Sequence, residues 1–171
     1  MKRWIAIGGI AVGVGLVGYA LLSSQTDEEL IRARLDQLTT AVRVDQGDNP
    51  LARGARVRRA IHEVLTRNVV VRIPDLPDPG QGREGLLGIA MYAGHRYRTA
   101  EVKLSDTSIQ LDTRKIEASV KSEATLTATD AAGLHRQNRH VLFRFTRAAN
   151  HWRISSIEVS APPDLPPEAR P

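Results

Sequence analysis

The chain has 171 residues, with 24 Lys and Arg against 19 Asp and Glu, so its formal net charge is +5. It has no cysteine, which excludes disulfides, thiolate catalysis and Cys-ligated metal. Twenty of the basic residues are Arg. Because this charge excess is modest, it does not indicate an anionic polymer as partner, and we expect no nucleic acid.

A basic tip, residues 1–3, precedes an uncharged apolar run over residues 4–22. A helix of that length spans about 28 Å, close to the thickness of the hydrocarbon core of a bilayer. We expect a retained signal anchor that crosses the cytoplasmic membrane once. Because the basic flank is N-terminal, the C-terminal domain should be periplasmic or extracytoplasmic. The alternative is a cleaved signal peptide, for which Gly18 and Ala20 would supply a cleavage site.

The predicted domain, residues 26–161, opens with two amphipathic helices. Thr26 and Glu29 form a capping box, and apolar residues follow at helical spacing until near Gly47. Asn49 as N-cap and Pro50 as first helical residue then begin a second helix. Its apolar stripe should face inward. We interpret four nearby arginines as a solvated surface: Arg53, Arg56, Arg59 and Arg67.

A short β-branched run over Asn68–Ile73 predicts one buried strand, which Pro74 ends. Pro and Gly then dominate a turn-rich stretch. From Arg83 to Gly94 the apolar residues return to helical spacing, which predicts a third helix.

From Tyr97 onward the apolar period becomes two, which predicts four long antiparallel strands. The apolar phase slips near Asp106 and again at Ser155–Ser156, so we expect a β-bulge at each place. Half of the residues in 162–171 are proline, and this tail should be extended or disordered.

This order of helix, helix, strand, helix and four strands describes an α+β cone, a curved antiparallel sheet wrapped on three helices. The chain resembles the nuclear transport factor 2-like superfamily in its SnoaL-like (polyketide-cyclase) form. This resemblance implies a cystatin/nuclear transport factor 2-like cone. The resemblance rests on Val69–Ile73, Gly82–Leu87 and the closing His151–Val159, in which Trp152 and Ile154 should fill the cone. One membrane helix before such a domain is similar in layout to the Mce-associated membrane proteins and the periplasmic bitopic component of type IV secretion systems.

Isomerase-type members of the superfamily place a Tyr on the first helix and a carboxylate near the first strand. This sequence has no Tyr in its first predicted helix and no acid from Asn68 to Ile73, which argues against ketosteroid-isomerase chemistry. Among the remaining His, Tyr and Arg side chains, we nominate His62, His95 and Tyr97 as candidates for catalysis. Each also has a structural interpretation, since a His at a helix end can stabilise the helix dipole. The histidines lack paired spacing and no phosphate-binding or nucleophile motif occurs, so we expect no metal and no cofactor.

Two functions remain open. The first is a non-catalytic, membrane-anchored module that binds a protein partner, with a homodimer through the sheet face as a further expectation. The alternative is a small-molecule-binding or SnoaL-like isomerase/cyclase-type cone with its site around His62, His95 and Tyr97. A cone filled by side chains would favour the first, and a deep apolar pocket with convergent His and Tyr the second.

Overall fold

The computed structural model describes residues 25–73 and 82–160. Within these ranges, no helix combines the length and the apolar character needed to cross a membrane. Three predicted segments lie outside the described residues: the basic tip 1–3, the anchor 4–22 and the Pro-rich tail 162–171.

Two compact units divide the chain, Met1–Leu30 and Ile31–Pro171. The described part of the first unit confirms the capping box. The Thr26 amide donates to Glu29 Oε2 at 2.7 Å, and the Glu29 amide donates to Thr26 Oγ1 at 3.2 Å. Because these bonds satisfy amides that have no partner within a helix, they start the helix α2, Asp27–Val42.

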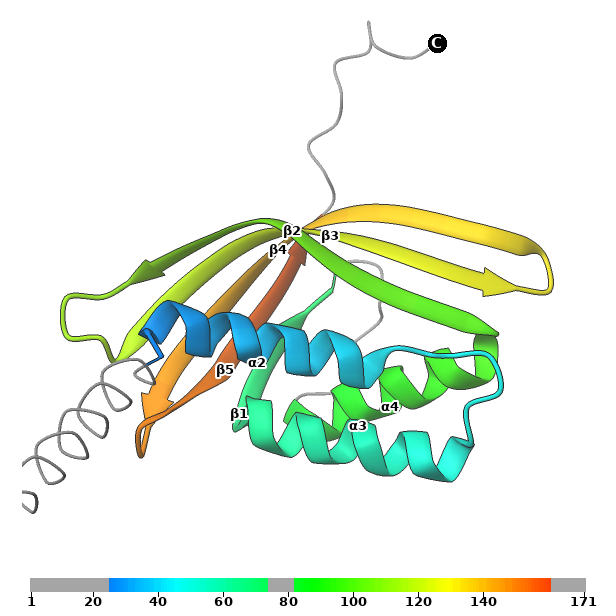
Figure 1. Cartoon of the computed structure of the whole chain (residues 1–171), viewed down its shortest axis with the longest axis horizontal. Helices are drawn as coiled ribbons and strands as arrows, with labels where there is room; N and C mark the ends of the chain where they lie inside the picture. Colours follow the sequence, from blue (N-terminus) through cyan, green and yellow to red (C-terminus); the bar gives the residue numbers. More distant parts are fainter. Residues whose placement is uncertain (1–24, 74–81, 161–171) are drawn as a thin grey trace, which may run out of the picture. The chain divides into compact units, whose positions relative to one another are not determined.

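The second unit contains the rest of α2, two further helices and the strands (Figure 1). Helices α3 and α4 lie side by side and both contact β1. In chain order these elements are α3 (Pro50–Val64), β1 (Leu65–Arg72), α4 (Gly82–Arg96), β2 (Thr99–Leu111), β3 (Glu117–Asp130), β4 (Gly133–Ala148) and β5 (His151–Ser160).

The sheet has the strand order β1-β5-β4-β3-β2. Its last four strands pair antiparallel, as expected, but β1 pairs parallel with β5, so the sheet is mixed. The expectation of a wholly antiparallel sheet is therefore wrong for β1. After β1 the chain passes through α4 to the far edge of the sheet, and three successive reversals bring β5 back beside β1 in the same direction.

Helix α2 ends earlier than the predicted end near Gly47. Its last residue is Val42, because Val44 forms a bridge with Ala100 at the start of β2. The Val44 amide donates to Ala100 O at 2.8 Å, and the Ala100 amide donates back to Val44 O at 3.0 Å. This long-range pairing replaces the helical bonds that the apolar spacing predicted.

Both predicted β-bulges are confirmed. The β2–β3 register shifts between Ser105 and Ser108, where Asp106 has a φ of 50°. Opposite β4, the β5 register shifts at Ser155, since the residues on either side of it pair with consecutive β4 residues. Each bulge bends its strand and restores its apolar residues to the inner face.

The core lies between the helices and one face of the sheet. Trp152 is 1% exposed, which confirms the prediction that it is a core anchor. Phe145 and Ile154 beside it are as deeply buried. The other fully buried side chains are Ile31, Val57, Ile61, Val64, Leu65, Val69 and Val120.

Candidate functional site

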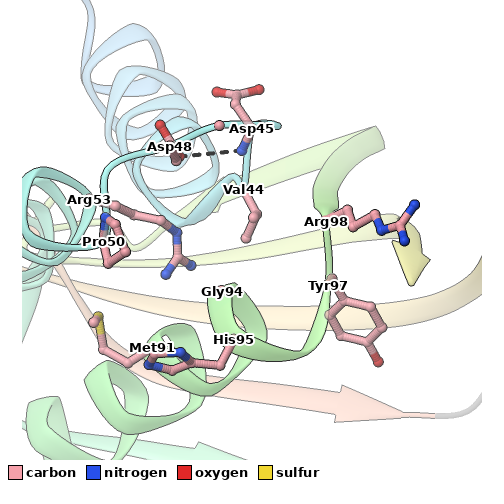
Figure 2. Close-up of a pocket in the computed structure, with 11 residues that line it drawn as sticks. Val44, Asp45, Asp48, Pro50, Arg53, Met91, Gly94, His95, Tyr97 and Arg98 are labelled. Carbon is pink, nitrogen blue, oxygen red and sulfur yellow. Dashed lines mark hydrogen bonds between the residues drawn. The ribbon is translucent and has the colours of Figure 1, made fainter. Parts of the chain in front are cut away.

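A pocket of about 210 Å³ lies where the α2–α3 connection meets the C-terminal end of α4 (Figure 2). Two predicted site residues, His95 and Tyr97, line it. His62 is not among its lining residues. The structure therefore brings together two of the three candidates and leaves the third elsewhere.

His62 is an exposed residue in the last turn of α3. Its Nδ1 lies 3.4 Å from Nη1 of Arg83, whose Nη2 donates to Leu65 O at 2.6 Å. Burial, followed by the charges of Arg153 and Arg67, lowers the pKa of the Arg83 guanidinium. These contacts join α3, β1 and α4 around His62.

Tyr97 also has a structural role. It packs against a small buried cluster of Val44, Ala100 and Ala128, which closes the edge of the sheet beside the pocket. The Arg96 guanidinium carbon lies 5.9 Å from the centre of the Tyr97 ring. The Tyr97 ring therefore lies near a cation and also packs on the apolar cluster.

Arg53 is buried, which corrects its interpretation as part of a solvated surface. Only 3% of the residue is exposed, and its Nη2 donates to Ala90 O in α4 at 2.6 Å. The sequence carried a signal that this interpretation missed. Arg53 precedes Val57 by four positions and therefore lies on the same apolar stripe.

The carboxylates that line the pocket are paired with arginines other than Arg53. Asp48 Oδ2 lies 2.9 Å from Arg56 Nη2, and Asp45 Oδ1 lies 2.8 Å from Arg43 Nε. The hydrogen bond from Arg56 is the largest cause that lowers the pKa of Asp48. Burial lowers the pKa of the Arg53 guanidinium, although the nearby Asp48 opposes this. Arg53 still remains cationic at neutral pH.

A buried carboxylate, Asp130, closes the β3–β4 hairpin. Its side chain is 1% exposed, with Oδ1 2.9 Å from His135 Nε2 and Oδ2 2.9 Å from Arg96 Nη2. The Ala132 amide also donates to Oδ1. The hydrogen bond from His135, followed by that from Ala132, lowers the pKa of Asp130. This cluster ties α4 to the hairpin.

A second, larger hollow of about 730 Å³ lies between α2 and α3, and we call it the helical groove. Gln37 Nε2 of α2 donates to Glu63 Oε2 of α3 at 2.5 Å, and both residues line it. The other lining residues combine small and charged side chains: Ala33, Asp36, Thr40, Ala41, Ala52, Ala55, Arg56, Arg59 and Ala60.

In the part of the chain that the structure describes, no three His, Asp or Glu residues are grouped so as to hold a metal ion.

Sequence comparison finds no matching family model and no significantly similar curated protein. Solved structures do match. A Streptomyces avermitilis protein named as "a putative dehydratase from the NTF2-like family" aligns with a TM-score of 0.60 and 15% identity, over 81% of this chain and 98% of that one. The fold is nuclear transport factor 2-like.

Two further structures share this nuclear transport factor 2-like fold. Kfla4162 from Kribbella flavida aligns with a TM-score of 0.63 and 11% identity, over 79% of this chain and 90% of that one. A variant of Rv3472, a protein of unknown function from Mycobacterium tuberculosis, aligns with a TM-score of 0.59 and 16% identity, over 80% of this chain and 72% of that one. At such identities the nuclear transport factor 2-like fold is what the proteins share, and this fold hosts many functions.

Proposed function

We propose that this chain is a non-catalytic, membrane-anchored extracytoplasmic module that binds a protein partner. The observation that carries the proposal is the filled interior of the domain. Trp152 and Phe145 are each 1% exposed and Ile154 is fully buried, so the chain's own side chains occupy the space in which a catalytic cone would hold its substrate. The membrane anchor is the apolar run of residues 4–22.

The helical groove is the surface we assign to the partner. It exposes alanines beside charges of both signs, among them Asp36 and Arg59. Small side chains let another backbone approach closely, and charges at the edge of an interface orient the partner and speed its association. Both features suit a protein partner better than a small apolar ligand.

A pair of adjacent arginines on α3 tests this assignment. Arg59 lines the groove and Arg58 does not, although both are exposed. Full-length protein should be cross-linked in native membranes and its partner captured. We expect Arg59→Glu to lose the partner by about tenfold, with Arg58→Glu close to wild type. Equal capture by both variants would refute the groove assignment, and recovery of only this chain would identify the partner as a second copy.

A small-molecule-binding or isomerase/cyclase-type cone is the second candidate function. The observation that favours it is that the pocket joins His95 and Tyr97 with the buried Arg53. A few polar groups beside apolar walls are typical of a ligand site. Turnover assays and ligand binding, rather than partner capture, distinguish this candidate.

A further inference from the structure

The pocket beside α4 contains a buried cation, Arg53, that forms no direct ion pair with a described residue, although the charge of Asp48 acts on it from beyond ion-pair distance. No Asp or Glu among the described residues lies within ion-pair distance of Arg53, because Asp48 pairs with Arg56 and Asp45 with Arg43. The Arg53 Nε is buried and has no hydrogen-bond partner within the described ranges. A guanidinium offers five N–H groups, and the one protein bond to Ala90 O leaves most of them unused.

The residues around Arg53 leave space for its guanidinium. Figure 2 shows its guanidinium between Pro50 and the end of α4 at Gly94. A Cβ at position 94 would lie 2.7 Å from Arg53 Cζ and 3.3 Å from Arg53 Nε, so the glycine makes room for the cation. Burying a guanidinium without a counter-ion is costly, and an anionic ligand would offset that cost.

The other lining residues define the ligand's chemistry. His95 and Arg98, both exposed, also line the pocket, although Figure 2 shows the Arg98 side chain directed away from Arg53. Val44, Met91 and Tyr97 supply an apolar wall. A volume of about 210 Å³ is below that of pockets for drug-sized molecules, so the ligand must be small.

We propose that this pocket binds a small monocarboxylate, with its carboxylate on Arg53 and its short carbon chain against Met91. The planar fork of a guanidinium matches a carboxylate in two-point contact. A monoanion fits better than a phosphate dianion, because Asp45 and Asp48 also line the pocket and repel a dianion about twice as strongly as a monoanion. The proposal deepens the second candidate function and is independent of the partner-binding proposal, which concerns the helical groove.

Butyrate is the probe, with inorganic phosphate for comparison. In ¹⁵N-labelled full-length protein, butyrate should shift the backbone amides of Gly94 and Tyr97 in a saturable way, with millimolar affinity. Arg53→Lys keeps a charge but loses the fork, and should weaken binding about tenfold. Arg98→Gln should weaken it about two- to threefold. Arg58→Gln, outside the pocket, should bind as wild type does.

Three results would overturn the site: no saturable shift, shifts confined to residues away from the pocket, or wild-type affinity in a folded Arg53→Lys protein. Phosphate binding as tight as butyrate would overturn the carboxylate assignment. The amide shifts in the wild type decide the matter even if Arg53→Lys does not fold. Loss of butyrate binding with intact partner capture, or the reverse, separates this proposal from that for the groove.

Discussion

The guanidinium of Arg53 occupies the space that a side chain at position 94 would need, and residue 94 is glycine. The two residues lie on neighbouring helices, 41 positions apart in the chain. Arg53 also donates to Ala90 O, one turn earlier in α4 than Gly94. The packing of α3 on α4 therefore depends on the charged side chain of Arg53 and on the absence of a side chain at Gly94.

Gly94→Ala should destabilise the protein. A methyl group there must displace the Arg53 side chain and break its bond to Ala90 O, at a cost of about 1–3 kcal/mol after the gain in helix propensity. Gly88 is the matched control, since it lies in the same helix with no atom within 4 Å of a built Cβ. Gly88→Ala should stabilise by about 0.5–1 kcal/mol. Urea unfolding measures both, and equal effects would contradict the packing argument.

Trp152→Ala should cost about 3–5 kcal/mol of unfolding free energy, because it removes the largest fully buried side chain. Tyr92 is a matched aromatic control, being 67% exposed on α4. Tyr92→Ala should change stability by less than about 0.5 kcal/mol. A Trp152→Ala protein that keeps its melting temperature but loses a binding activity would show that Trp152 serves recognition instead.

Asp130 should make stability fall at low pH. Its pKa is lowered below the ordinary 3.8, first by the hydrogen bond from His135. A carboxyl of this kind adds stability above its unfolded pKa, and that stability is lost as the pH falls through the folded pKa. Wild type should therefore lose unfolding free energy below about pH 4, and Asp130→Asn should lose less over that range. Urea unfolding at stepped pH measures this, and identical profiles would speak against the assignment.

The double variant His95→Gln, Tyr97→Phe separates binding from catalysis. If the chain is a non-catalytic module, partner capture and folding should be nearly unchanged, because His95 is exposed and Phe preserves the ring that packs on Val44 and Ala100. A catalytic cone would instead lose function by about two or more powers of ten without unfolding, as expected when a general acid or base is removed. Circular dichroism confirms folding in either case, and a clear loss in the folded variant would lead us to abandon the module.

The apolar run over residues 4–22 should remain on the mature protein. Its length exceeds that of a signal-peptide core, and its basic flank is N-terminal. Mass spectrometry of protein extracted from membranes should recover a peptide from this run. Chains that all begin near Leu21 would show that it is cleaved.

Local chemistry was enough to predict several elements of the fold. Thr26 and Glu29 bond to each other's amides within one turn, so their spacing alone predicted the start of α2. The bulges at Asp106 and Ser155 could be predicted because one inserted residue shifts the apolar residues of a strand from one phase of the two-residue repeat to the other. The same alternation placed Trp152 in the core.

Tertiary structure alone decided the features that depend on distant partners. Val44 is not helical because its backbone amide and carbonyl form hydrogen bonds with the backbone of Ala100, which is distant in the chain. β1 runs parallel to β5 because of the path of the intervening chain, which no local pattern records. Arg53 shares the apolar face of Val57, but its charge led to its interpretation as a surface residue; a carbonyl and a glycine on α4 provide the bond and the space that bury it. Periodicity shows which face of a helix or strand a residue occupies. Only the element that packs on that face determines whether the face is buried or exposed to solvent.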